Sequence, residues 1–195
     1  GSDERRRQRL ATLDGIQGYQ LYWQGEAHRA ITLFQRSLDT LNDPVAYAYV
    51  YAQLLHFLAN SYAEEGHRET ALALLRTTLA EATAHHRPAM MILLGARALI
   101  HFNAGELAEA GATAQRMVTL ADSPQTRREW SDVGLVQVWR GWGIYYLGAI
   151  RYEQNDLEAA ARHWQQVEAI RYQVNPGVFH DSLTGLALIA QAQGE

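Results

Sequence analysis

The chain has 195 residues, of which 48% are hydrophobic and 19% are charged, and its formal net charge is −4. It contains no cysteine, which excludes disulfide bonds, thiolate zinc sites and cysteine nucleophiles. So small a negative charge gives no reason to expect direct contact with nucleic acid, because that binding depends on cationic neutralisation of phosphates. No apolar run approaches the roughly 20 residues that a membrane helix needs. We therefore predict a cytoplasmic protein that makes no membrane contact.

Four segments share one layout, in which an aromatic-rich helix and a short turn precede a second helix with small residues at fixed offsets. In chain order they are residues 18–38, 59–79, 98–118 and 148–168. The turn residue is Gly25, Gly66, Gly105 or Asn155, and these residue types tolerate the left-handed conformation that ends a helix. The four segments therefore predict four helix-turn-helix pairs.

Small and large residues recur at fixed distances from each turn. A small residue stands seven positions before it, an alanine five positions after it, and a residue of variable size nine positions after it. In chain order these three sets are Gly18, Ala59, Ala98 and Gly148; Ala30, Ala71, Ala110 and Ala160; and Phe34, Leu75, Ala114 and Trp164. We expect the small residues to let two antiparallel helices cross closely, with the variable residue filling the space beside them.

The prolines support the same division of the chain. Pro44, Pro88, Pro124 and Pro176 all fall between repeats, where the first turn of a helix accepts a residue without an N–H group. Asn42-Asp43, Ser123 and Asn175 provide N-caps beside three of them. Gly194 is a fifth turn residue, at the end of the last helix. The spacing of 50 residues between the turns at 105 and 155 exceeds the neighbouring spacings of 39, from 66 to 105 and from 155 to 194. We assign the extra residues to a longer helix through residues 130–150.

These patterns predict an all-α protein, a right-handed α-solenoid of antiparallel helix pairs with a period near 40 and about nine helices. The repeats cover residues 3–43, 44–86, 87–123 and 124–174, and a half repeat covers residues 175–195, all in a single domain over residues 1–195. An unpaired apolar helix is an unusual end for a solenoid, because terminal repeats normally carry a polar outer face. We therefore expect the natural polypeptide to continue beyond Glu195.

The order of small, aromatic, glycine and alanine residues resembles the tetratricopeptide repeat, whose period is about 34. Two stretches resemble a narrower group, the MalT-like, ATP-binding LuxR-type transcription activators of bacteria. They are LGAIRYEQNDLEAAARHW at 147–164 and NPGVFHDSLTGLALIAQAQGE at 175–195. The resemblance implies a superhelical sensor segment that binds a small-molecule inducer or a regulatory protein and controls self-association. The chain has no G-x-x-x-x-G-K-[ST] motif, so ATP binding does not carry over.

The first helices of stacked pairs line a common concave groove, which would suit a sugar-like, aromatic or peptide effector. Each of these side chains could equally pack between neighbouring repeats. The groove residues that we predict are Tyr19, Tyr22, Trp23, His56, Asn60, Phe102, Asn103, Trp142, Tyr145 and Tyr152, with Glu153 beside them.

We predict no catalytic residue, no cofactor and no metal ion. The adjacent histidines His85-His86 point about 100° apart on a helix, and the residues of His180-Asp181-Ser182 are too close in sequence to form a triad. Two alternatives to the sensor stay open at this point. The first alternative is a free-standing scaffold that binds a peptide or protein partner. The second is a structural arm of a multidomain signalling enzyme.

Overall fold

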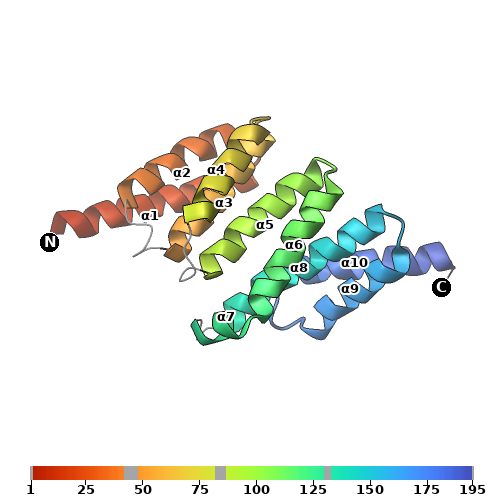
Figure 1. Cartoon of the computed structure of the whole chain (residues 1–195). Helices are drawn as coiled ribbons and strands as arrows, with labels where there is room; N and C mark the ends of the chain where they lie inside the picture. The colour runs from red at the N-terminus through yellow and green to blue at the C-terminus, as the bar shows by residue number, and fades with distance from the viewer. Residues whose placement is uncertain (1, 42–47, 82–86, 130–132, 195) are drawn as a thin grey trace. The chain divides into compact units, whose positions relative to one another are not determined.

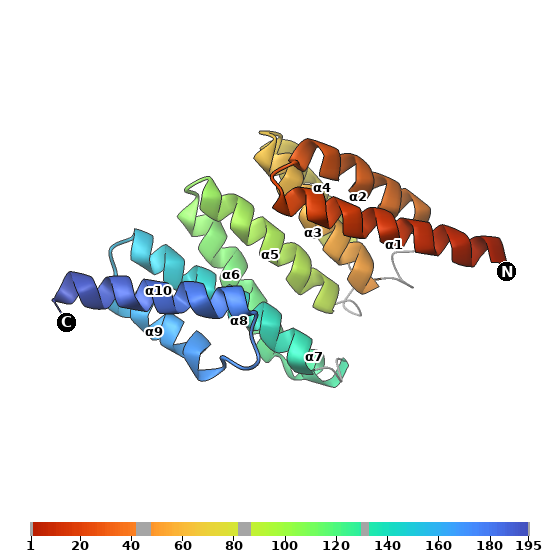
Figure 2. The same cartoon turned by 180° about the vertical axis from the view of Figure 1, so that it is seen from behind.

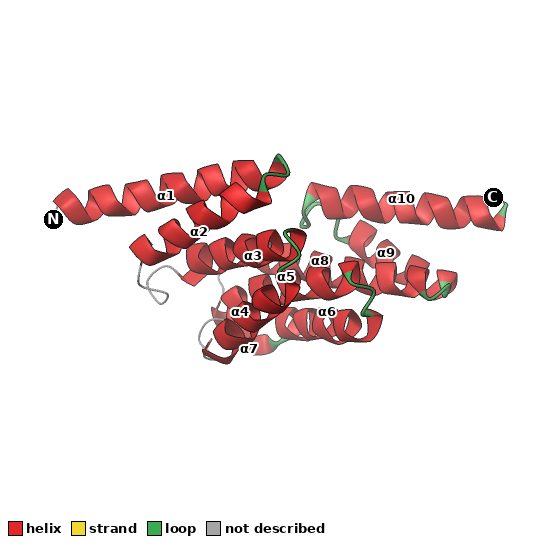
Figure 3. Cartoon of the chain, turned by 90° about the horizontal axis from the view of Figure 1, so that it is seen from above, coloured by secondary structure: helices red, strands yellow, loops and turns green. Residues whose placement is uncertain are grey.

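The computed structural model describes residues 2–41, 48–81, 87–129 and 133–194 (Figure 1). Within these ranges the chain forms ten α-helices and no strand, and the structure is 88% helical (Figure 3). Neighbouring helices pack antiparallel, in the manner of an α-solenoid. The predicted all-α class is confirmed.

The chain divides into two compact units, and the boundary between Ala96 and Arg97 falls inside a helix. The helices of the first unit are α1 (Ser2–Trp23), α2 (Ala27–Leu41), α3 (Ala48–Glu64), α4 (Arg68–Glu81) and the first part of α5 (Arg87–Asn103). Helix α2 packs against both α1 and α3, and α4 packs against α3. The single domain over residues 1–195 stays a prediction.

The second unit begins with the rest of α5. Its other helices are α6 (Leu107–Asp122), α7 (Pro124–Glu129), α8 (Val133–Glu153), α9 (Leu157–Ala169) and α10 (Pro176–Gln193). Helix α8 is the centre of this unit, because α6, α7, α9 and α10 all contact it. Figure 2 shows α10 beside α8 and α9.

All the predicted turn residues adopt the left-handed conformation. Their φ angles are +77° at Gly25, +82° at Gly66, +74° at Gly105, +60° at Asn155 and +80° at Gly194. In the first four turns, the N–H of the turn residue donates to the carbonyl three residues earlier at 2.9–3.1 Å. The next N–H donates to the carbonyl five residues earlier at 2.8–2.9 Å. These bonds satisfy carbonyls that the end of a helix would otherwise leave unpaired.

At the close helix crossings, small and large side chains lie at the positions that the sequence predicts. The alanines five residues after each turn are completely buried, at 0% exposure for Ala30, Ala71, Ala110 and Ala160. A Cβ added to Gly18 would lie 2.8 Å from Phe34, and one added to Gly148 would lie 2.7 Å from Cδ1 of Trp164. Where the second helix carries a large ring, the first helix therefore carries glycine.

One more residue, nine positions before the turn of the following repeat, joins the crossing in the first and the fourth repeat. With this position added, the sequence gives one triple for each repeat, in chain order Gly18, Phe34 and Phe57; Ala59, Leu75 and Ala96; Ala98, Ala114 and Tyr146; and Gly148, Trp164 and Gly185. Phe57 stacks on Phe34, with ring centroids 6.2 Å apart, and a Cβ on Gly185 would lie 2.6 Å from Cε3 of Trp164. The smallest central residue, Ala114, is accompanied by the large Tyr146. In the first and fourth triples, large and small side chains thus pack directly against one another.

The prolines also take their predicted places. Pro88 is the second residue of α5, and Pro124 and Pro176 open α7 and α10. The side chain of Asn175 caps α10 by accepting a hydrogen bond from the Gly177 N–H at 2.8 Å. Pro44 and the predicted cap Asn42-Asp43 lie outside the described residues.

Helix α8 is the predicted longer helix, since its 21 residues exceed the 17 of α3 and of α5; it spans Val133–Glu153, and residues 130–132 lie outside the described residues. A separate short helix, α7, precedes it and was not predicted. The Ser123 side chain accepts the Thr126 N–H at 3.1 Å, and Pro124 follows in the first helical position. This cap starts a new helix directly after α6. The described residues therefore hold ten helices in place of about nine.

The completely buried alanines provide a test of the repeat alignment. Replacing Ala71 by leucine should cost roughly 1–3 kcal/mol, because the added side chain overpacks the crossing of α3 and α4. Ala73→Leu, two residues further on and exposed, is the matched control and should change stability little. Urea denaturation of both variants measures the difference, and equal midpoints would contradict the alignment.

Candidate functional site

An apolar groove lies between α1 and α3 in the first unit. Its cavity has a volume of about 270 Å³. The walls are Ala11, Thr12, Gly15, Ile16 and Tyr19 of α1, Phe34 and Ser37 of α2, and Val50, Gln53, Leu54 and Phe57 of α3. We call these eleven residues the apolar groove. Tyr19 is the only predicted site residue among them.

The rim of the groove is exposed and apolar. Ile16, Tyr19 and Val50 are 52%, 45% and 44% exposed. The hydroxyls of Thr12 and Ser37 already donate hydrogen bonds, from Thr12 to the Gln8 carbonyl at 2.9 Å and from Ser37 to the Ala11 carbonyl at 2.8 Å. These two wall residues therefore offer an effector apolar contact rather than a free hydroxyl donor.

Three predicted aromatic residues of α1 gather around Phe57. The ring of Tyr19 meets Phe57 edge-on at 4.8 Å between centroids, and Tyr22 meets it at 5.3 Å. Trp23 is 67% exposed and lies 5.5 Å from Tyr22. Burial and a hydrogen bond with Glu64 raise the pKa of Tyr22 above its ordinary range. Phe57 was not predicted as a site residue, but Tyr19 and Tyr22 both pack against it at the aromatic side of the groove.

The two predicted polar anchors of the first unit do not line the apolar groove. His56 is partly buried, and its Nδ1–H donates to the Ile92 carbonyl at 3.0 Å. Burial lowers the pKa of His56 to about 4, although this hydrogen bond opposes the shift. Asn60 is 3% exposed, and its Oδ1 has no hydrogen-bond partner among the described residues. Their role as anchors for an effector stays a prediction.

His56 should make the stability of the protein depend on pH. The unfolded imidazole titrates near 6.5 and the folded one near 4, so the unfolded state binds more protons between these values. Stability is therefore lost as the pH falls below about 6.5, by about 2 kcal/mol between pH 7 and pH 5.

Urea denaturation of the wild type and of His56→Gln at both pH values measures this contribution. His163, whose pKa is also lowered by burial, keeps its own contribution in both proteins. The pH-dependent loss should be smaller in the variant by about 2 kcal/mol. An identical loss in both proteins would contradict the assignment.

The predicted aromatic residues of the second unit are half-buried and pack onto its core. Trp142 and Tyr145 contact a cluster that includes Ile144 and Val167, while Tyr152 and Phe102 contact a cluster around Trp164. Rings of Trp142, Tyr145 and Phe102 all meet Tyr146, at centroid distances of 5.7, 5.6 and 6.2 Å. Asn103 and Glu153 are exposed. In this unit the rings contribute to the core, and a groove that joins both units stays a prediction.

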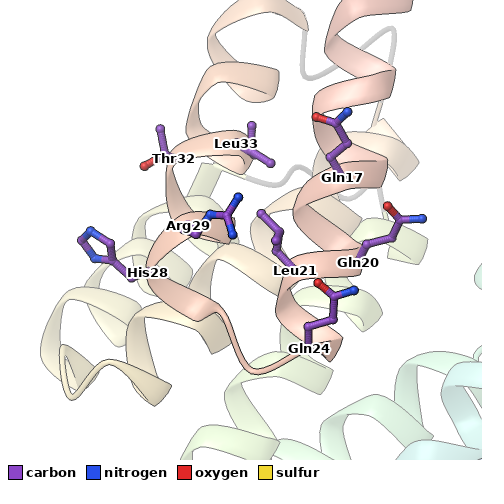
Figure 4. A pocket seen from close by; sticks show the side chains of 8 residues that line it. All are labelled: Gln17, Gln20, Leu21, Gln24, His28, Arg29, Thr32 and Leu33. Atoms are coloured by element: carbon purple, nitrogen blue, oxygen red, sulfur yellow. The ribbon is translucent and has the colours of Figure 1, made fainter.

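A second, more polar pocket of about 590 Å³ lies between α1 and α2 (Figure 4). Its walls are Gln17, Gln20, Leu21, Gln24, His28, Arg29, Thr32 and Leu33. Figure 4 shows Arg29 reaching toward α1, whereas His28 points away from it. Arg29 forms an ion pair with Glu26, so its charge is already compensated. This pocket offers carboxamides but no unpaired charge, and none of its residues was predicted.

Nothing in the described parts of the chain resembles a metal centre, since they hold no group of three His, Asp or Glu side chains able to bind one ion. None of the described helices is both long and apolar enough to cross a bilayer. The fold and the groove define an all-α helical-repeat protein with an open apolar surface. Comparison of the chain with protein-family models, curated proteins and solved structures gave no match.

Proposed function

We propose that this chain is a non-catalytic binding segment that takes up an effector in the apolar groove. The observation that carries the proposal is the cavity of about 270 Å³ beside the exposed side chains of Ile16, Tyr19 and Val50. Exposed apolar side chains that surround a cavity are typical of binding sites. The described walls contain no ionisable side chain other than the tyrosine, which supports binding rather than catalysis.

The dimensions of the groove favour an effector with one bulky apolar group. Small-molecule sites usually measure about 300–1,000 Å³, so this cavity of about 270 Å³ lies just below that range. It has room for a single aromatic or branched aliphatic group. Rings such as Tyr19 and Phe57 provide broad contact area at low entropic cost. The rest of the effector would lie over the exposed rim, where Trp23 is available.

The wider role that we propose is the sensing and self-association segment of a MalT-like LuxR-type regulator. The support is the resemblance of residues 147–164 and 175–195 to that group, together with the regular repeats. The effector is then a small-molecule inducer or a regulatory protein. The coding sequence on both sides of this segment tests the role. An upstream nucleotide-binding motif with a downstream helix-turn-helix would support it, and a kinase or cyclase module would contradict it.

A free-standing peptide-binding scaffold is the second candidate. The size of the cavity favours it, because one apolar side chain of a peptide would occupy the groove while the backbone lies over the rim. Competition between an apolar small molecule and a peptide with a single aromatic residue would show which class the groove prefers.

Charged residues at the rim should weaken binding. We expect Ile16→Glu or Val50→Glu to weaken binding of 1-anilinonaphthalene-8-sulfonate by about tenfold, because burial of a carboxylate without a partner is costly. Fluorescence titration gives the dissociation constants. Leu188→Glu is the matched control, since Leu188 is exposed to a similar degree, 47%, but lies on α10 in the second unit. A loss confined to the control would place the apolar binding surface on α10 and refute the groove.

A further inference from the structure

The apolar groove opens between the first two repeats, and the helices on both of its sides are present. Its walls belong to α1 and α2 of the first repeat and to α3 of the second. The position sixteen residues before each turn distinguishes the second repeat from the later ones. Val50 holds this position on α3 and is 44% exposed. The matching residues of the later repeats are all buried, namely Ala89, Trp139 and Val178.

Short residues of α1 shape the floor of the groove. Gly15 has no side chain, and a Cβ added there would lie 2.9 Å from Cδ2 of Leu54. Leu54 of α3 thus packs directly on the backbone of α1. Thr12 stands thirteen positions before its turn, where the later repeats carry the larger residues Gln53, Ile92 and Trp142. The first repeat therefore differs from the others at a wall position of the groove.

Arginines continue one wall of the groove toward the N-terminus. Four of the five residues from 5 to 9 are arginines. Arg9 stands three residues before Thr12 and seven before Ile16, so it lies on the same face of α1 as these two wall residues. Arg6 lies about one turn further on. Both side chains are exposed, and neither has a hydrogen-bond or ion-pair partner among the described residues.

The neighbouring carboxylates do not compensate these arginines. Asp14 of α1 is bound by Arg36 of α2, whose Nε donates to Oδ2 of Asp14 at 2.6 Å. Glu64 lies near the other end of α3, where it forms a hydrogen bond with Tyr22. Among the described residues, the end of the groove beside Thr12 therefore carries unpaired positive charge.

We infer that the effector is a small anionic amphiphile, whose apolar group fills the groove and whose acid group binds Arg9. This role of Arg9 rests on the proposed function, because it requires an apolar effector between α1 and α3. A guanidinium group can donate two parallel hydrogen bonds to one acid group. Arg9 and Thr12 are neighbours on the helix surface, with Cβ atoms about 5–6 Å apart. An aromatic or branched acid with a short side arm would span this distance.

Two fluorescent probes that differ in charge test this role. 1-Anilinonaphthalene-8-sulfonate carries a sulfonate, and N-phenyl-1-naphthylamine is the same molecule without it. In titrations of the 195-residue chain, Arg9→Gln should weaken binding of the sulfonate about threefold to fivefold and leave that of the neutral probe unchanged. Higher ionic strength should weaken binding of the sulfonate to the wild type, and to Arg9→Gln much less.

Arg76→Gln is the matched control, because it removes the same charge from α4 of the same unit. Arg76 is exposed, has no partner among the described residues and does not line the groove. Its replacement should change the affinity for neither probe. Arg9 is exposed as well, so both variants should fold normally, which circular dichroism checks.

An unchanged affinity of Arg9→Gln for the sulfonate would overturn the role of Arg9. If Ile16→Glu still weakened binding of the neutral probe, the proposed function would stand without it. Binding of the neutral probe that is insensitive to Ile16→Glu would contradict both. Equal losses of sulfonate binding in Arg9→Gln and Arg76→Gln would also overturn the role of Arg9, because they would reflect net charge alone.

Discussion

Replacing Trp164 by alanine should lower the free energy of unfolding by about 3–5 kcal/mol, the range for removal of a large buried ring. Trp164 is 4% exposed and forms one cluster with Ala149, Ala160 and Ile189. Its indole N–H donates to the Tyr145 carbonyl at 3.3 Å, so the substitution also removes a hydrogen bond that joins α9 to α8. The ring contacts α8 and α10 from α9, and its loss should loosen all three helices of the second unit.

Urea denaturation of Trp164→Ala measures this loss. Tyr172→Ala is the control, because Tyr172 lies in the same unit but is 89% exposed, and it should stay within about 0.5 kcal/mol of the wild type. A loss below about 1 kcal/mol for Trp164→Ala would show that the ring does not hold the three helices together.

The second large effect concerns Gly185, where one added methyl group should cost about 3 kcal/mol, the upper end of the range for overpacking. A Cβ at this position would lie 2.5 Å from Cη2 and 2.6 Å from Cε3 of Trp164. These atoms belong to a rigid ring. Gly148 of α8 also lies against this ring, so the ring has little room to move away from the added methyl group. The gain of about 1 kcal/mol in helix propensity does not offset such a clash.

Gly111→Ala is the matched control for Gly185→Ala. Its Cβ would meet a single atom, Cδ1 of Ile150, at an ordinary 3.8 Å, so the substitution should stabilise α6 by about 0.5–1 kcal/mol. In a Trp164→Leu background the cost of Gly185→Ala should largely disappear, because the ring atoms that the added methyl group would meet are absent. The same cost in both backgrounds would show that positions 164 and 185 contribute independently to stability. It would contradict the direct packing of Trp164 against Gly185.

The sequence predicts the turns and crossings well because both depend on local chemistry. Glycine and asparagine adopt the left-handed conformation more readily than most residues, so residues such as Gly25 and Asn155 mark helix ends where they recur at a regular spacing. The alanines, such as Ala30, are identified by their fixed distance from those turns. The short helix α7 was missed because its signal, a serine cap and a proline, also fits the start of one longer helix.

The candidate site was predicted only in part. Tyr19 lines the apolar groove, whereas a concave groove along all the first helices stays a prediction. The tertiary contacts decide which other residues join Tyr19. Phe57 was missed, although the repeat pattern contains a signal for it. Ile16 and Phe57 both stand nine positions before their turns, as does Tyr146 of the second unit. In contrast, His56 faces the Ile92 carbonyl of α5, a contact that no spacing within the chain predicts.

Binding of an apolar effector between α1 and α3 is the central claim, and methyl NMR spectroscopy tests it most directly. The 195-residue chain, labelled at isoleucine, leucine and valine methyl groups, is titrated with 1-anilinonaphthalene-8-sulfonate. The groove predicts that the signals of Ile16, Val50 and Leu54 shift first and saturate together, before those of Leu183 and Leu188 on α10. Saturable shifts confined to α10, with Ile16 and Val50 unchanged, would contradict the claim.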